Sequence, residues 1–181
     1  MEFYQVEETN VLRVVVRWIV DVVVMICLAW FAIYSFGTQV RIVGQSMTPN
    51  LRGDDVVLMD RLSYDFGEPE RFDIVVFERE DHKSNVKRII GMPGETVQIL
   101  SGYIYINGKY LEADNDLNQV SLVGLAGSPI VLGEDEYFLL GDNRDGSEDS
   151  RFANIGNVKR EQIQGKIWLR LAPFLDFGVV E

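Results

Sequence analysis

The hydrophobic pattern divides the chain into one long apolar stretch near the N-terminus and a longer remainder of short alternating runs. Between residues 18 and 36 the only charged residue is Asp21. Because about 20 apolar residues cross a bilayer as an α-helix, this stretch predicts a transmembrane anchor. We assign residues 18–40 to the anchor, residues 1–17 to a tail before it and residues 41–181 to a single domain after it.

Three alternatives compete with this anchor. A buried core helix is rarely apolar on every face, and an interfacial amphipathic helix has a charged face that this stretch lacks. A cleaved secretory signal is the closest rival, because Arg13 and Arg17 precede the apolar run. The run ends in Ser35-Phe36-Gly37 without an Ala-x-Ala site, which favours an uncleaved anchor.

The remainder has the pattern of a mainly β domain. Short apolar-rich runs predict strands, and the segments between them are rich in Gly, Pro and Asn. Asn107-Gly108 is a strong signal for a two-residue hairpin turn. Residues 158–164 are predicted to form a helix that Gly165 terminates. The predicted strands are residues 55–62, 72–78, 86–91, 96–100, 103–106, 137–140 and 166–171.

The composition and the motifs that the sequence lacks limit which partners and cofactors are expected. The chain has 181 residues and a formal net charge of −11, which argues against nucleic acid or an anionic membrane surface as an electrostatic partner. Cys27 is the only cysteine, so no intrachain disulfide can form. The sequence has no Cys/His cluster, no Walker loop and no dinucleotide fingerprint, and we expect neither a metal nor another cofactor.

A candidate nucleophile, Ser46, follows the anchor in the segment Gly44-Gln45-Ser46-Met47-Thr48-Pro49-Asn50-Leu51. Pro49 and Asn50 favour a rigid turn at this point. A serine hydroxyl needs a nearby base to remove its proton. The only histidine, His82, belongs to a charged run typical of a solvated loop, so a histidine base is not expected.

Lys87 is the better candidate for the base. In the strand-like run over residues 86–91, Lys87 shares one face with Ile89, and Arg88 lies on the other. Burial of the Lys87 face would disfavour the charged amine and lower its pKa by up to about 3–5 units. Arg88 cannot take this role because a guanidinium stays protonated. Taken alone, the serine turn and the strand lysine are both common without any catalytic role.

A third segment, residues 141–151, is dense in Asp, Asn and Gly. A calcium loop requires carboxylates at its first and twelfth positions, and with Gly146 as the sixth residue those positions fall on a glycine and a phenylalanine. The spacing excludes such a loop. The alternative interpretation, a polar surface turn with Asx hydrogen bonds from Asp142 and Asn143, stays open.

Together the three segments resemble the type I signal peptidases, the Ser–Lys proteases that remove signal peptides from exported proteins. The resemblance extends from the N-terminal anchor to Arg151. The matching blocks are Ser46-Met47-Thr48-Pro49-Asn50-Leu51, Arg52-Gly53-Asp54, Lys87-Arg88-Ile89-Ile90-Gly91-Met92-Pro93-Gly94-Glu95 and residues 141–151.

The resemblance implies a role for each candidate residue. It makes Ser46 the nucleophile and Lys87 the general base, and Ser147 corresponds to a serine that orients the lysine. Asp149 and Arg151 correspond to a supporting ion pair. The remaining candidates are Asp142 as a supporting residue, and Gly44, Met47 and Pro49 on the substrate and oxyanion side.

Three positions depart from the usual pattern of that family. Many members place a hydroxyl residue two positions before the nucleophile as an oxyanion donor, where this chain has Gly44. Losing one such donor can cost about 3 kcal/mol in other proteases. Other members tolerate glycine there, which indicates a subgroup. Asn50 and Glu95 replace the more usual threonine and aspartate, and we expect neither to affect the chemistry.

The resemblance also implies a setting and a fold. The N-terminus is expected in the cytoplasm and the domain outside a bacterial cell membrane, near the protein export machinery. The expected substrates are signal peptides with small residues, typically alanine, one and three positions before the cut. The expected fold is a mainly β, signal-peptidase-type antiparallel sheet with a short inserted subdomain at about residues 107–135.

Two other functions stay open from the sequence. A Ser–Lys protease with a dedicated substrate, such as a pilin precursor, would carry the same two catalytic groups. A membrane-anchored binding module would keep the fold and lack the activity. Self-cleaving repressors of related fold are disfavoured, because they carry a DNA-binding domain in place of the apolar stretch.

Overall fold

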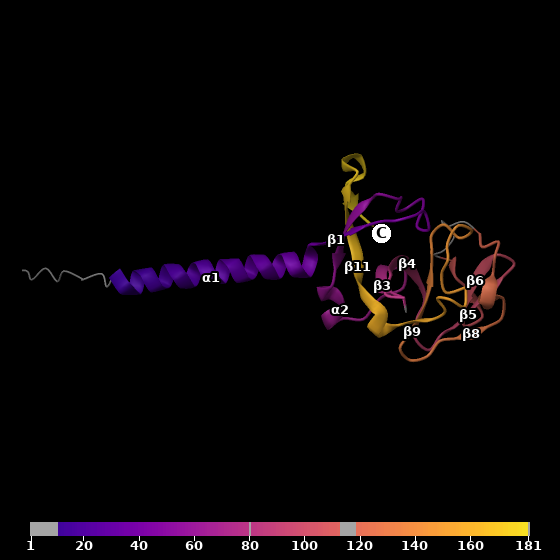
Figure 1. Ribbon diagram of the computed structural model, residues 1–181. Helices are drawn as coiled ribbons and strands as arrows, with labels where there is room; N and C mark the ends of the chain where they lie inside the picture. The colour runs from indigo at the N-terminus through magenta and orange to yellow at the C-terminus, as the bar shows by residue number, and fades with distance from the viewer. Residues whose placement is uncertain (1–10, 80, 113–118, 181) are drawn as a thin grey trace, which may run out of the picture.

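The computed structural model describes residues 11–79, 81–112 and 119–180. Its first element is helix α1 (Val11–Phe36), which extends away from the domain as a single rod (Figure 1). This helix is long and apolar enough to cross a bilayer, and none of its apolar window is buried. It includes residues that we assigned to the tail and ends before residues 38–40, which belong to a strand. The part of the predicted tail before Val11 lies outside the described residues.

The domain is built around an antiparallel sheet with the strand order β1-β2-β11-β3-β4-β9-β10, and β12 pairs with β11 (Figure 1). The predicted mainly β fold with one N-terminal apolar helix is therefore confirmed. The strands of this sheet are β1 (Thr38–Arg41), β2 (Val56–Asp60), β3 (Ile74–Glu78), β4 (Ser84–Gly91), β9 (Glu136–Leu140), β10 (Val158–Lys159), β11 (Ile163–Ala172) and β12 (Gly178–Val179).

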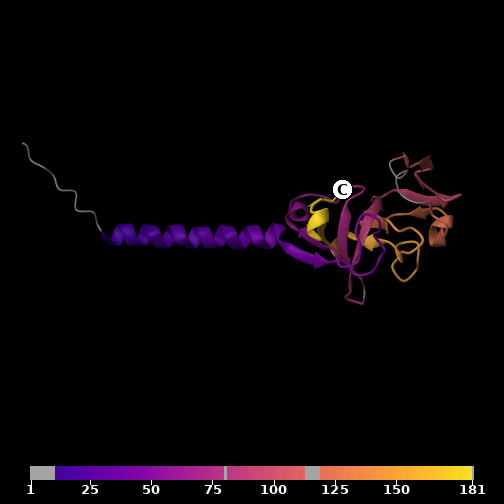
Figure 2. The same cartoon turned by 90° about the horizontal axis from the view of Figure 1, so that it is seen from above.

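A second, four-stranded sheet has the order β7-β6-β5-β8. Figures 1 and 2 both show it at the end of the molecule away from α1. The turn between its central and edge strands is the predicted Asn107-Gly108 hairpin, in which both residues have positive φ. This sheet begins at Thr96, well before the expected start of an insertion near residue 107. Its strands are β5 (Thr96–Leu100), β6 (Tyr103–Ile106), β7 (Lys109–Tyr110) and β8 (Ile130–Val131).

A short helix, α2 (Leu62–Phe66), begins at the last residue of the strand predicted over residues 55–62. The Asp60 carboxylate accepts hydrogen bonds from the backbone N–H and the hydroxyl of Ser63. An acceptor at this position satisfies a backbone N–H in the first turn of the helix, so strand β2 ends at Asp60 and helix α2 begins.

The helix predicted over residues 158–164 is wrong. The segment is split between strand β10, the 3₁₀ turn η3 (Arg160–Gln162) and the start of β11. Burial alternates at Ile163, Gly165 and Ile167, which is the period of a strand. The two other 3₁₀ turns among the described residues are η2 (Gly124–Gly127) and η4 (Phe174–Asp176).

Strand β4 carries the candidate base and lies between β3 and β9. Ile89 and Ile90 point to opposite faces of the strand and pack into two different hydrophobic clusters. Both faces are therefore buried, which is usual for a central strand covered on both sides. As a result Lys87 and Arg88 are both buried, with 3% and 5% of their surface exposed.

Replacing Gly91 with alanine is expected to destabilise the fold. A Cβ at this position would lie 2.5 Å from a methyl of Val97 and 2.9 Å from the Cβ of Phe138. Overpacking of this kind typically costs about 1–3 kcal/mol. We expect the thermal midpoint of the detergent-solubilised chain to fall. Gly178→Ala is the control, because nothing lies within 4 Å of its added methyl. Equal midpoints for the two variants would contradict this account of the packing.

Candidate active site

Ser46 lies on the turn that follows β1. The turn is closed by hydrogen bonds from the Thr48 N–H to the Gln45 carbonyl and from the Leu51 N–H to the Met47 carbonyl. Met47 and Leu51 are almost fully buried in one hydrophobic cluster. The apolar side chains thus fix the turn to the core, and Ser46 stays partly exposed.

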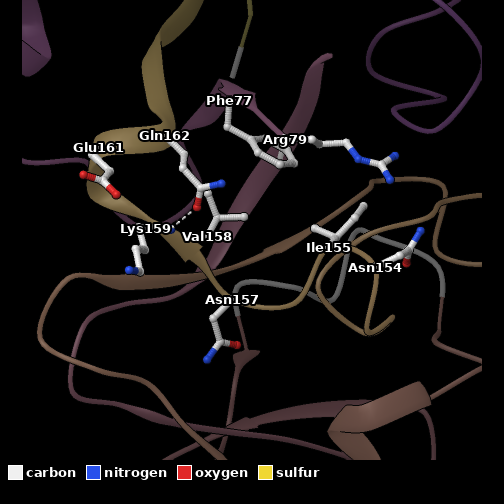
Figure 3. A pocket seen from close by; sticks show the side chains of 9 residues that line it. All are labelled: Phe77, Arg79, Asn154, Ile155, Asn157, Val158, Lys159, Glu161 and Gln162. Carbon is white, nitrogen blue, oxygen red and sulfur yellow. Dashed lines mark hydrogen bonds between the residues drawn. The ribbon is translucent and has the colours of Figure 1, made fainter. Parts of the chain in front are cut away.

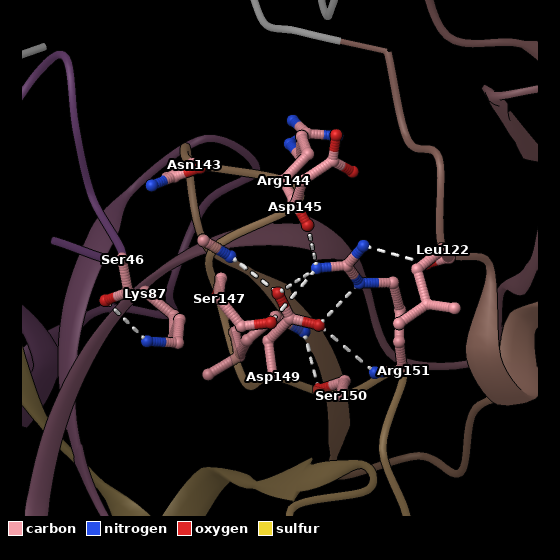
Figure 4. Close-up of polar contacts among 12 residues, drawn as sticks. Ser46, Lys87, Leu122, Asn143, Arg144, Asp145, Ser147, Asp149, Ser150 and Arg151 are labelled. Carbon is pink, nitrogen blue, oxygen red and sulfur yellow. Dashed lines mark hydrogen bonds and ion pairs between the residues drawn. The ribbon is translucent and has the colours of Figure 1, made fainter.

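The amine of Lys87 lies 2.9 Å from the hydroxyl oxygen of Ser46 (Figure 4). The two residues are 41 positions apart in sequence, and the structure brings them into hydrogen-bond contact. Burial lowers the pKa of Lys87 to about 8, although the negative charges of Asp149 and Glu148 oppose this effect. A large fraction of this amine is therefore neutral near pH 8 and able to accept a proton.

Asp149 and Arg151 form the expected ion pair, and both side chains are completely buried. The guanidinium binds the carboxylate through two nitrogens, at 2.7 and 2.9 Å. Asp149 also accepts the Gly141 N–H at 3.1 Å. Because Arg151 compensates its charge, Asp149 stabilises the charged form of Lys87 less than a lone carboxylate would.

Ser147 lies against the nucleophile turn. A Cβ built on Gly141 would be 2.2 Å from the Ser147 hydroxyl and 2.5 Å from the Ser46 carbonyl oxygen, so only glycine lets the two serines approach at this point. The Ser147 hydroxyl is buried and, among the described residues, has no hydrogen-bond partner. Its predicted role in orienting Lys87 therefore stays a prediction.

A second buried ion pair, which the sequence did not indicate, lies behind the candidate base. The Arg88 guanidinium binds the Asp142 carboxylate through two nitrogens, each at 2.8 Å. Asp142 also accepts a hydrogen bond from the Asn50 side chain at 2.8 Å. These contacts join strand β4, the nucleophile turn and the loop that begins at Gly141. Asn50, which we expected not to affect the chemistry, is part of this connection.

Asn143 is another residue that we did not single out for the site. Its backbone N–H donates to the Ser46 carbonyl and its side-chain amide donates to the Gln45 carbonyl, both at 3.0 Å. Its side-chain oxygen accepts the Gly146 N–H at 3.1 Å, which is the Asx-type bond left open from the sequence. Asn143 therefore holds the nucleophile turn against the loop that carries Ser147.

A groove of about 270 Å³ opens in front of Ser46. Of the candidates on the substrate side, Met47 contributes to its wall, whereas Pro49 is exposed and does not. Gly44 has a φ of +80° with open space beside it. The groove is lined by Val40, Arg41, Ile42, Val43, Ser46, Met47, Val76, Arg79, Lys83, Ser84, Asn85 and Val86.

A separate cavity of about 280 Å³ lies near β10 and contains neither Ser46 nor Lys87 (Figure 3). It shares only Arg79 with the groove. The Arg79 guanidinium lies 3.4 Å from the Glu148 carboxylate, which also accepts a hydrogen bond from Asn154. The contact between Ser46 and Lys87 lies outside this cavity, so the groove is the candidate site. Within the described ranges no three His, Cys, Asp or Glu side chains form a metal site.

Comparisons with known proteins show the family of this chain. A family model described as signal peptidase, peptidase S26, matches residues 15–172. A signal peptidase I from Bacillus caldolyticus is 34% identical over 172 residues, covering 89% of this chain and 91% of that protein. A probable signal peptidase I-2 from Synechocystis is 34% identical over 157 residues, covering 82% of this chain and 69% of that protein. The crystal structure of a signal peptidase I from Enterococcus faecalis is 32% identical and covers 55% of this chain and 96% of its own, with a TM-score of 0.43.

Gly141→Ala is expected to inactivate the site. The added methyl would push Ser147 and the Ser46 carbonyl away from their positions, and a displacement of about 1 Å at a catalytic group can cost about 10²-fold in rate. The measurement is kcat/KM for cleavage of a preprotein, with Gly178→Ala as the control for a methyl in open space. Full activity of Gly141→Ala would show that the close approach of the two serines is not needed.

Proposed function

We propose that this chain, which belongs to the signal peptidase family (peptidase S26) and removes signal peptides from preproteins, does so with Ser46 as nucleophile and Lys87 as general base. The observation that carries the proposal is the 2.9 Å contact between the Lys87 amine and the Ser46 hydroxyl. The amine is almost completely buried and has a lowered pKa, which are the properties a lysine base requires. Arg88, its neighbour on the strand, is already bound to Asp142 and cannot act as a base.

The reaction follows from these two groups. The neutral amine of Lys87 accepts the Ser46 proton while the serine oxygen attacks the scissile carbonyl carbon. The tetrahedral intermediate collapses, and the leaving amine takes the proton from the Lys87 ammonium. The signal peptide is then an ester of Ser46. A water that gives its proton to Lys87 attacks this ester and releases the peptide with a free carboxylate.

The oxyanion of the intermediate needs a hydrogen-bond donor, and the Ser46 backbone N–H is the candidate. Among the described residues this N–H has no acceptor. Gly44 supplies no hydroxyl, and its φ of +80° is one that a serine side chain would adopt only with strain. The geometry of the turn therefore favours stabilisation of the oxyanion by the Ser46 backbone N–H.

The substrate is proposed to bind as an extended strand beside β4. Strand β3 pairs with residues 84–88 of β4, whereas β9 pairs only from Arg88 onward. Among the described residues, one edge of β4 before Lys87 is therefore unpaired, and it leads directly to the amine. A peptide that pairs with this edge would direct alternate side chains into the groove. The groove walls include branched apolar side chains such as Ile42 and Val86, and a shallow apolar wall suits small residues such as alanine.

The supporting residues are proposed to act through Lys87. The Asp149–Arg151 ion pair fixes the loop that carries Ser147 and keeps the carboxylate charge compensated. The hydroxyl of Ser147 has no other hydrogen-bond partner among the described residues, so it is available to the lysine amine when the substrate enters. Asp142 acts more remotely, by fixing β4 through Arg88.

The lipid bilayer is the second proposed partner. Helix α1 would anchor the chain in a bacterial cell membrane with the N-terminus in the cytoplasm and the domain outside, beside the export machinery. Phe174 and Leu175 of η4 support a close membrane contact, because they are 87% and 96% exposed. Figure 1 shows this segment, in yellow, at the top of the domain on the side nearer α1. Exposed aromatic and aliphatic side chains at that level would lie in the interfacial layer.

The proposed dyad predicts a specific pH dependence. Because only the neutral amine accepts the Ser46 proton, kcat/KM for a preprotein with an Ala-x-Ala junction should rise with pH and level off above about 8. Ser46→Ala and Lys87→Met should each lower kcat/KM by roughly 10³-fold or more. The assay uses the detergent-solubilised full chain between pH 6 and 10.

Lys109→Met is the matched control, since it removes an exposed lysine far from the groove. Unchanged activity of Ser46→Ala would contradict the assignment of the nucleophile. A wild-type chain that cuts a pilin precursor and no Ala-x-Ala preprotein would identify a dedicated substrate instead.

The orientation can be tested with the single native cysteine removed. In a Cys27→Ser background, Glu134→Cys places a thiol on the exposed surface of the domain. We expect a membrane-impermeant maleimide to label this variant in intact cells. Glu7→Cys in the same background should react only after the cells are permeabilised. The reverse labelling pattern would show that the domain faces the cytoplasm.

A further inference from the structure

One carboxylate, that of Asp21, lies inside the apolar helix α1. Asp21 is the only charged residue between residues 18 and 36. It is exposed, on a helix that Figures 1 and 2 show extending free of the domain. Within the described ranges no hydrogen bond or ion pair involves this carboxylate, and Arg17, one turn before it, is not paired with it. The described part of the chain therefore supplies no partner for Asp21.

The position of Asp21 along the helix sets its depth in a bilayer. Only Gly37 separates the helix from the edge strand β1, whose unpaired backbone groups cannot enter the hydrocarbon. The outer boundary of the hydrocarbon therefore lies at Phe36 or before it. A helix rises about 1.5 Å per residue, so Asp21 lies roughly 22 Å along the axis from Phe36, in a hydrocarbon core about 30 Å thick. In the proposed orientation, Asp21 is at least about 7 Å inside the inner boundary.

Neither membrane topology nor Arg17 accounts for a carboxylate at this depth. An ionisable side chain inside the hydrocarbon is unfavourable unless it is paired, and such residues usually mark functional sites. Arg13 and Arg17 already precede the span, and acidic residues contribute little to orientation. Side chains on a helix lean toward its N-terminus, so an arginine one turn before Asp21 extends toward the headgroups and away from the carboxylate. The partner of Asp21 is therefore a cation on another molecule.

A signal peptide carries a cation at a matching position. Its basic n-region is followed by an apolar h-region of about 7–15 residues. The apolar run after Asp21, residues 22–36, matches the upper end of this range. When the outer ends of the two apolar runs are level, the basic residue before a long h-region lies at the depth of Asp21. Before a shorter h-region it lies farther out, and the long side chain of a lysine or arginine leans back toward Asp21.

We infer that Asp21 binds the last basic residue in the n-region of the signal peptide that is cut. The inference rests on the proposed function, because it needs the substrate beside α1 and the N-terminus in the cytoplasm. A carboxylate and an ammonium or guanidinium group attract each other more strongly away from water, and pairing relieves both of an uncompensated charge in the hydrocarbon. The peptidase then contacts its substrate at two points, in the groove before the cut and at Asp21 before the h-region.

The test uses the full chain in phosphatidylcholine vesicles that also contain the preprotein. The preprotein has an Ala-x-Ala junction, an h-region of about 14 residues and one lysine directly before it. We expect Asp21→Asn to raise KM about fivefold, as for loss of a polar contact between membrane helices, with kcat within about twofold. Asp21→Glu keeps the charge and should stay within about twofold of the wild-type KM. Cys27→Ser, a neutral change in the same helix, should leave both constants unchanged.

Changes in the substrate provide the other half of the test. When glutamine replaces the lysine of the preprotein, the wild type and Asp21→Asn should have the same KM. When glutamate replaces it, Asp21→Lys should have a lower KM than the wild type. An equal rise of KM for Asp21→Asn with the lysine and the glutamine preproteins would overturn the inference, as would an unchanged KM with both.

Two further results separate the inference from the proposed function on which it rests. A soluble peptide with the same junction, but without an n-region or h-region, tests the groove alone. A wild-type chain that cuts neither substrate rejects the proposed function and the inference with it, whereas one that cuts both without any effect of Asp21 rejects the inference only. Disulfide cross-linking of two full chains through Cys27, lost in Asp21→Asn, would overturn the inference in favour of a second copy of α1 as the partner.

Discussion

The proposed dyad needs a lysine amine that stays uncharged next to a serine hydroxyl, and this sets the requirements for the rest of the site. Burial of Lys87 in a strand covered on both faces removes water from the ammonium form and lowers its pKa. The nearby carboxylate of Asp149 opposes this effect without overcoming it. Its two-point contact with Arg151 compensates its charge, and the pair is itself completely enclosed. The central position of β4 and the charge compensation of Asp149 thus both favour the neutral form of the Lys87 amine.

The sequence predicts best the parts of the molecule that local chemistry fixes. Strands β5 and β6 begin and end at the predicted residues, because Ser101-Gly102 and Asn107-Gly108 are turn sequences that adopt positive φ. Ser46 and Lys87 can be recognised for a similar reason, since each lies in a short motif of its own. Their contact across 41 positions then follows from the family resemblance without any knowledge of the packing.

Other contacts between distant segments could not be predicted. Arg88 and Asp142 are 54 positions apart, and nothing local to either residue indicates that they pair. The side chain of Asn143 binds the carbonyl of Gln45 from 98 positions away. The helix predicted over residues 158–164 was wrong for a related reason. Its only helix signal was a glycine stop, whereas pairing of Ile163 and Gly165 with β3 decides its structure. Long-range pairing outweighs weak local preference in such segments.

Gly37 is the only residue between helix α1 and strand β1. Its N–H donates to the Ile33 carbonyl at 2.9 Å, and any side chain there would come within 2.6 Å of the same oxygen. Such a short, bonded connection gives the domain little freedom to move away from the end of the helix. For a protein anchored by that helix, the distance between the lipid surface and the groove is nearly constant. Selection among peptide bonds would then depend on their height above the membrane as well as on their neighbouring residues, and a matching sequence deeper in an exported protein would be out of reach.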